Sequence, residues 1–252
     1  MAPPRFLTQL PEDMLVEVAA RVAASSTFPM DDLRRLRGVS SLVRDRVCGA
    51  TLVRSSLNLK RALEQEDNEE TRQRLIANTY EAGNLEALFI EGMRAVFRQH
   101  DGAPHPPLDD LEEAARGWHK PAAYMLAMFL WRANRGAEDD HRAKELLAQV
   151  ADDGTAVRKW SDRGVCGTLQ HILDILWSDV WPLGYHPRLD MLGEPVPRAV
   201  HQCTYRDPNG IRRGSCCTFG GRDGIFWWSY FCSEECRIRR QCEDTFPIIL
   251  FS

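Results

Sequence analysis

The residues best suited to chemistry are cysteines, and six of the eight lie between positions 203 and 242. Cys232 stands just before Ser233, a good helix N-cap residue, and Cys236 follows in what would be the first helical turn. A thiolate is favoured at a helix N-terminus by the helix dipole and by the unpaired backbone N–H groups. We therefore expect both sulfurs to point toward one metal ion.

A structural zinc site takes four ligands, so this pair needs two more. Cys203 can supply one of them. Cys216 or Cys217 can supply the other, but not both, because adjacent residues of an extended strand face opposite ways. We favour Cys217, with Cys216 or His201 as substitutes, and predict that Zn²⁺ is bound by Cys203, Cys217, Cys232 and Cys236. The alternative is a set of reduced cysteines without metal.

The sequence around the last two ligands resembles known zinc modules. Residues 230–237 read Tyr-Phe-Cys-Ser-Glu-Glu-Cys-Arg, which is similar to the second half of treble-clef fingers such as the MYND type and to the Cys-rich tails of some plant F-box proteins. The first half departs from that pattern because it has no Cys-x-x-Cys pair. The resemblance implies a small α+β, zinc-finger-like module at residues 199–246.

At the other end of the chain, two apolar runs have helical spacing. Pro11 can open a first helix, and Met14, Leu15 and Val18 recur on one face of it. A second run at residues 33–47 follows a break at residues 25–29. The pattern predicts a pair of short helices.

This pair resembles an F-box over residues 10–47, within a domain at 7–50. The resemblance rests on Leu-Pro-Glu-Asp at residues 10–13 and on Leu-x-x-Leu-x-x-Val-Ser at residues 33–40. The sequence departs from the family at Ser40 and Ser41, where Cys-Lys is frequent, and in a long connector at residues 23–32. The resemblance implies binding to a Skp-type adaptor through Leu10, Pro11, Met14, Leu15, Val18, Leu33, Leu36 and Val39. The alternative is an ordinary helical hairpin whose leucines form its core.

Because they await a partner, the residues of this surface should be more exposed than core residues. We expect this exposure for Pro11, Leu15, Val18 and Val39.

Residues 48–70 carry opposite charges at helical spacing and predict an exposed helical linker.

The middle of the chain contains a weak internal repeat. Similar phrases recur around Gly83, Gly117 and Gly154, at spacings of 34 and 37 residues. Each glycine can close a helix in the left-handed conformation, and Ala87 and Ala122 should lie in tight contacts between helices. We predict a short helical-repeat solenoid at residues 71–181, similar to the Sel-like relatives of tetratricopeptide repeats. The alternative is a helical bundle without a repeat.

Composition and absent motifs narrow the functional classes. The net charge of −4 disfavours a protein that coats nucleic acid. No apolar run reaches 18 residues, and residues 1–9 do not resemble a signal peptide, so we expect no membrane association and a place in the nucleus and/or cytoplasm. No Walker loop, His-Glu-x-x-His or Gly-x-Ser-x-Gly occurs, so we expect no enzyme.

The sequence therefore predicts a mostly α protein with N-terminal F-box helices, a short helical-repeat solenoid and a small Cys-rich module. The resemblances imply a plant substrate-receptor subunit of a Skp–cullin–F-box ubiquitin ligase. Such a subunit would bind an unidentified target protein through the helical repeats and/or the Cys-rich tail. The alternative is a zinc-finger nucleic-acid-binding or scaffold protein.

Overall fold

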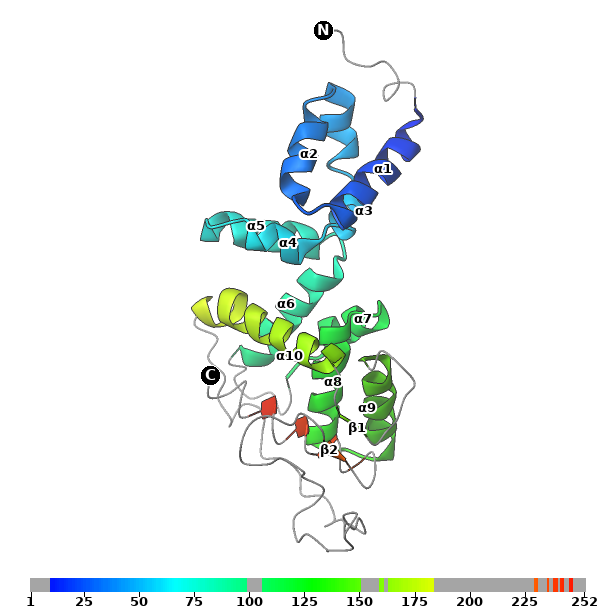
Figure 1. Cartoon of the computed structure of the whole chain (residues 1–252), viewed down its shortest axis with the longest axis vertical. Coiled ribbons are helices and arrows are strands. Elements are labelled where there is room, and N and C mark those ends of the chain that lie inside the picture. Colours follow the sequence, from blue (N-terminus) through cyan, green and yellow to red (C-terminus); the bar gives the residue numbers. More distant parts are fainter. Residues whose placement is uncertain are drawn as a thin grey trace, which may run out of the picture. The chain divides into compact units, whose positions relative to one another are not determined.

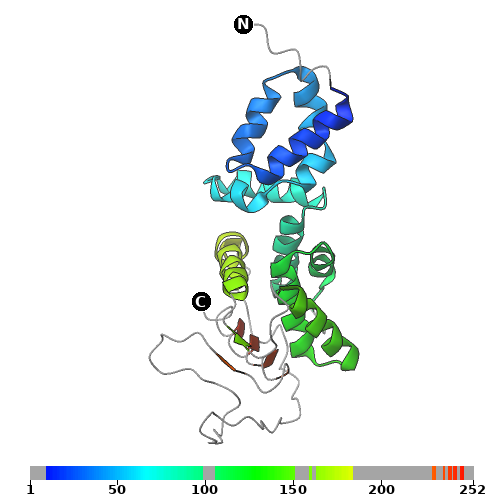
Figure 2. The same ribbon diagram turned by 45° about the vertical axis from the view of Figure 1, so that its right-hand side comes forward.

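The structure is a computed structural model that describes residues 10–98, 106–150, 159–160, 163–183 and 229–230, together with seven single positions between 235 and 246. It divides into two compact units, residues 1–91 and 92–252. This boundary lies inside the repeat region predicted at 71–181. Helices dominate both units (Figures 1 and 2), so the predicted mostly α fold is confirmed for the described residues.

The first unit is a set of short helices around a small apolar core. The core of its N-terminal part is formed by Leu15, Ala19, Ala23, Leu33, Val43 and Val47, all of which are buried. The elements are α1 (Glu12–Ser25), α2 (Pro29–Arg37), η2 (Val43–Val47), α3 (Thr51–Ser55), α4 (Leu59–Glu64), α5 (Glu69–Tyr80) and the first part of α6 (Leu85–Phe97).

The connection between α1 and α2 is shorter than predicted. Helix α1 continues to Ser25 and α2 begins at Pro29, so only residues 26–28 connect them. The hydroxyl of Ser26 accepts a hydrogen bond from the backbone N–H of Phe28 (2.9 Å) and donates one to Asp32 (2.7 Å). These bonds hold the turn, and the fixed φ of Pro29 suits the first residue of a helix. The predicted long connector at residues 23–32 is wrong.

The second apolar run forms two helical segments, so the predicted pair of helices is in fact three. Helix α2 ends at Arg37, with Gly38 as its C-cap residue. The hydroxyl of Ser40 then accepts a hydrogen bond from the backbone N–H of Val43 (3.2 Å), and residues 43–47 form a separate π-helical turn, η2.

Residues 48–70 are not the exposed linker that their charge pattern predicted. They contain α3 and α4, and apart from Leu52, which is 45% exposed, the apolar side chains of these two helices are buried in the first unit. The buried residues are Val53, Leu57, Leu59, Ala62 and Leu63. Asn58 and Asn68 cap α4 and α5, accepting hydrogen bonds from the backbone N–H groups of Arg61 and Thr71.

Two turns have the same backbone hydrogen bonding, and together they define the repeat. Gly83 follows α5 with φ +75°, as predicted, and the N–H of Asn84 donates to the carbonyl of Thr79 (3.0 Å). In the corresponding turn of the second unit, the N–H of His119 donates to the carbonyl of Ala114 (3.1 Å). There the left-handed residue is Trp118 (φ 67°), because Gly117 has φ −78°. The predicted left-handed conformation of Gly117 is wrong by one residue, and Gly154 lies outside the described residues.

With this correction, corresponding positions are 35 residues apart, as from 84 to 119. Asn84 and His119 both cap the following helix, since each side chain accepts a hydrogen bond from the backbone N–H three residues ahead (3.3 Å in both cases). Those residues are Ala87 and Ala122, and both are fully buried, as the repeat prediction requires. The spacing is close to that of tetratricopeptide repeats.

The second unit is organised around one buried helix. Helix α8 packs against α7 and α9, and every residue from 121 to 131 is buried. The elements are the rest of α6, then α7 (Asp109–Arg116), α8 (Lys120–Ala133), α9 (Ala137–Val150), α10 (Arg163–Ile175), η3 (Leu176–Val180), η4 (Trp181–Leu183) and two short antiparallel strands, β1 (Lys159–Trp160) and β2 (Ser229–Tyr230).

Specific contacts hold the second unit together. Arg94 of α6 is buried, and its Nε and Nη2 donate hydrogen bonds to the backbone carbonyl of Asp179 in η3 (2.9 and 2.7 Å). The hydroxyl groups of Tyr124 and Thr245 lie 2.8 Å apart, and the ring of Phe129 packs 5.9 Å from that of Phe246. Thr245 and Phe246 therefore pack on α8.

Candidate functional site

An apolar strip runs along the solvent side of α1. Pro11 and Met14 are exposed, the latter by 51%, and Val18 is exposed by 39%. These positions are three and four residues apart, so the side chains follow one face of the helix. Large apolar side chains on a solvent-facing strip are typical of a surface that binds another protein.

Two of the predicted contact residues point inward instead. Leu15 is 4% exposed and Leu33 is 9% exposed, and both belong to the core of the first unit. The expected exposure of Leu15 is therefore wrong. Successive helical residues are about 100° apart, so Leu15 turns toward α2 and η2 while its neighbour Met14 faces solvent.

The remaining predicted residues lie at the margin between the core and solvent. Leu10, Leu36 and Val39 are half-buried. A shallow apolar depression of about 20 Å³ lies where α1 meets the end of α2 and η2. It is lined by Leu15, Val18, Ala19, Leu36, Val39, Val43 and Val47. A depression of this size has room for about one water molecule. It is therefore too small for a ligand, although it makes this apolar surface uneven.

Ion pairs border the apolar strip. Arg46 of η2 donates to Glu12 at the start of α1 (3.0 Å), and Arg21 donates to Glu17 one turn along α1 (2.8 Å). An apolar centre with a charged rim is the usual arrangement of a protein–protein interface. The Arg46–Glu12 pair also joins the two elements that border the depression.

The predicted zinc ligands cannot be compared with this geometry. Cys203, Cys217, Cys232 and Cys236 lie outside the described residues, as do the substitutes Cys216 and His201. Of the cysteines, Cys48 and Cys242 have described side chains, and both are half-buried. The Cys48 thiol donates to the carbonyl of Leu33 (3.9 Å), and burial raises its pKa above the ordinary value of a thiol.

Comparison with known proteins finds plant sequences similar to two parts of this chain. Residues 59–164 match the family described as plant tetratrico peptide repeats. That segment contains both turns of the 35-residue repeat. No helix in the described part of the chain is long and apolar enough to cross a membrane.

A relative from Arabidopsis thaliana, named provisionally as an F-box protein, is 34% identical over 144 residues. The match covers 57% of this chain and 46% of the relative, so the chain spans less than half of that protein's length. No solved structure matches. The chain is therefore similar to plant helical-repeat proteins and to a plant protein with an F-box name.

Proposed function

We propose that this protein is a substrate-receptor subunit of a Skp–cullin–F-box ubiquitin ligase, and that its first unit binds a Skp-type adaptor. The observation that carries the proposal is the exposed strip of Pro11, Met14 and Val18 on α1. The half-buried Leu36 and Val39 extend it across the shallow depression. The Leu-Pro-Glu-Asp opening of α1 and the F-box name of the relative support the same reading.

In this role the protein positions a target and carries no catalytic residue of its own. The helical repeats, with or without the Cys-rich tail, bind the target protein, and the adaptor connects them to the cullin-based ligase. Holding the target near a ubiquitin-charged enzyme raises its effective concentration there, which accelerates transfer without new chemistry. The complex works in the nucleus and/or cytoplasm of a plant cell.

We further propose that the tail is a zinc-finger-like module held by Cys203, Cys217, Cys232 and Cys236. The spacing of the cysteines supports this proposal. Structural zinc supplies folding energy directly to modules that are too small for a large core. The metal would therefore order the tail, leaving it available as a second surface for the target.

The adaptor-binding proposal is tested with the purified full chain and a purified plant Skp-type adaptor by isothermal titration calorimetry. Met14→Asp and Val18→Asp each place a charge in the proposed contact without disturbing a buried side chain. Each should weaken binding by about 2–4 kcal/mol, as for an interface anchor. Ala24→Asp is the matched control, because Ala24 is an exposed apolar residue on another face of α1.

Leu15→Asp is unsuitable for this test, because a charge at a residue that is 4% exposed would unfold the unit rather than probe its surface. Full-strength binding by both folded strip variants, or no binding by the unmodified chain, would overturn the proposal. Salt-dependent binding of nucleic acid by a chain that ignores the adaptor would favour the zinc-finger alternative.

A further inference from the structure

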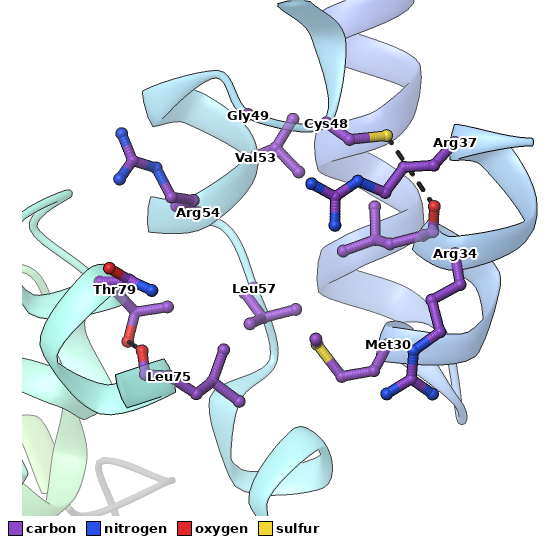
Figure 3. Close-up of a pocket in the computed structure, with 12 residues that line it drawn as sticks. Met30, Arg34, Arg37, Cys48, Gly49, Val53, Arg54, Leu57, Leu75 and Thr79 are labelled. Atoms are coloured by element: carbon purple, nitrogen blue, oxygen red, sulfur yellow. Dashed lines mark hydrogen bonds between the residues drawn. The ribbon is translucent and has the colours of Figure 1, made fainter. Parts of the chain in front are cut away.

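A second and larger hollow opens on the first unit (Figure 3), and it shares no lining residue with the depression beside α1. It has a volume of about 390 Å³ and lies among α2, α3 and α5. Its walls are mainly apolar, and the apolar side chains that line it are Met30, Leu33, Val53, Leu57 and Leu75. Both the size and the lining are typical of small-molecule sites.

The charged groups that line this pocket are all cationic. Arg34, Arg37 and Arg54 contribute to its wall, and among the described residues no carboxylate does. Arg34 is paired with Asp31 (2.7 Å) on its own helix. Arg37 makes no ion pair with any described residue. Its guanidinium extends into the hollow toward Val53 and Leu57 in Figure 3.

The acidic groups near the pocket are already engaged. Asp45 accepts a hydrogen bond from Arg44 (2.9 Å), which is the main cause that lowers the pKa of this carboxylate, and the charge of Arg37 adds to the lowering. The Nε of Arg54 is buried and has no hydrogen-bond partner among the described residues. A guanidinium that lacks a partner beside an apolar wall gains most from a ligand that brings an anionic acceptor.

Two of the uncharged polar side chains that line the pocket donate hydrogen bonds within the protein, and the third, Asn78, makes none with a described residue. The Cys48 thiol donates to the carbonyl of Leu33, and the Thr79 hydroxyl donates to the carbonyl of Leu75 (2.8 Å). The pocket therefore offers guanidinium groups and the Asn78 amide to a ligand's polar end, and aliphatic side chains to the rest of the ligand. This pairing selects a molecule that has an apolar body and one anionic group.

We propose that this pocket binds a small amphipathic carboxylate, with its carboxylate on Arg37 and its hydrocarbon body against Met30, Leu57 and Leu75. The planar guanidinium fork matches a carboxylate with two parallel hydrogen bonds. The pocket shares α2 with Leu36, which extends the strip of Pro11, Met14 and Val18, but it shares no lining residue with the depression beside that strip. The carboxylate proposal does not rest on the proposed function, and because the two are tested with different ligands and variants, either can fail without the other.

The test uses the full chain and octanoate as the probe, with 1-octanol as the uncharged analogue of the same length. Calorimetry should detect octanoate binding, and Arg37→Gln should weaken it about tenfold or more, as expected for the loss of a charge-assisted pair. Arg35→Gln is the matched control. It removes the same charge from the same helix, but Arg35 does not line the pocket and is paired with Asp32 (3.1 Å). Octanoate affinity should change less than about twofold in this variant, an estimate set by the weak long-range effect of a screened charge.

Cys48 provides a second readout inside the pocket. Iodoacetamide alkylation is followed by peptide mass spectrometry, at alkaline pH because burial raises the pKa of this thiol. Octanoate should slow alkylation of Cys48 in the unmodified chain and not in Arg37→Gln, while Cys242 serves as an internal reference. Equal binding of 1-octanol, equal losses in Arg35→Gln and Arg37→Gln, or unprotected Cys48 would each overturn the proposal.

Discussion

The side-chain amide of Asn84 donates a hydrogen bond to the backbone carbonyl of Leu57 across 2.8 Å, and Asn84 itself is only 3% exposed. The same amide reaches the carbonyls of Arg54 and Ser55 at the end of α3. Its Oδ1 atom caps α6 by accepting from the N–H groups of Glu86 and Ala87. One side chain thus joins the end of α3 to the start of the next repeat helix.

Replacing Asn84 by aspartate should separate these two roles. The carboxylate would keep an acceptor for the helix cap but would lose both N–H donors and face the carbonyl oxygens with a charge. We expect Asn84→Asp to lower the free energy of unfolding by about 2–4 kcal/mol, because buried acceptors lose their partner. Urea denaturation measures this loss.

The matched control is Asn68→Asp at the exposed cap of α5, where the side chain only accepts a hydrogen bond from Thr71. That change should alter the unfolding free energy by less than about 0.5 kcal/mol, since Asp and Asn cap helices equally well. If both variants were equally stable, the hydrogen bonds from Asn84 to the carbonyl groups would contribute nothing measurable to the free energy of unfolding.

Replacing Trp118 should raise the free energy of unfolding, whereas replacing Asn84 should lower it. It is 74% exposed and has φ 67°, a conformation that costs a residue with a large side chain about 1–2 kcal/mol. Asn tolerates this region, so Trp118→Asn should raise the unfolding free energy by about 0.5–1 kcal/mol. Gly83→Ala, at the corresponding turn, should lower it by a similar amount because Ala resists φ +75°. Thermal unfolding of both variants checks the pair, and a destabilised Trp118→Asn would contradict the strain argument.

Gly92 tests the close approach of α6 and α7. An added Cβ would lie 2.9 Å from the side chain of Leu111, which is fully buried and has no room to move. Gly92→Ala should therefore cost about 1–3 kcal/mol of stability through overpacking, although Ala gains up to about 1 kcal/mol over Gly in an exposed helix. In a Leu111→Ala background the cost should disappear, and a double-mutant cycle measures that coupling. Additive effects would show that the contact is not the cause.

Local patterns in the sequence predicted where helices and turns lie better than they predicted which side chains are buried. The sequence pattern placed α1 and the turn at Gly83 correctly, because both depend on residues close in sequence. It could not assign Met14 to solvent and Leu15 to the core, since only the packing of α2 and η2 decides which flank of α1 is covered. Gly117 was misassigned because a glycine is no more than permissive, and the hydrogen bonds of His119 fix the left-handed residue at Trp118.

The pocket beside Arg37 had no signal in the sequence. Its lining comes from α2, α3 and α5 and from the connecting residues Cys48, Gly49 and Leu57, and these residues form no local motif. What the sequence does contain is an arginine excess on α2, where Arg34 and Arg35 each have an aspartate three residues earlier and Arg37 does not. Pairing at helical spacing can thus be read from the sequence. Which arginines line the cavity cannot, since Arg34 is paired with Asp31 and lines it together with Arg37.

The proposed zinc site in the tail predicts a measurable metal content. Elemental analysis of the purified chain should find about one zinc ion per molecule, since four thiolates complete one tetrahedral site. Cys232→Ser and Cys217→Ser should lose the metal. Cys48→Ser in the first unit and Cys216→Ser should retain it. A chelator should unfold the tail while the helical circular-dichroism signal persists, because metal binding supplies the folding energy of the small module and not that of the helices. A metal-free chain, or zinc that survives in Cys232→Ser, would leave reduced cysteines without metal as the correct description.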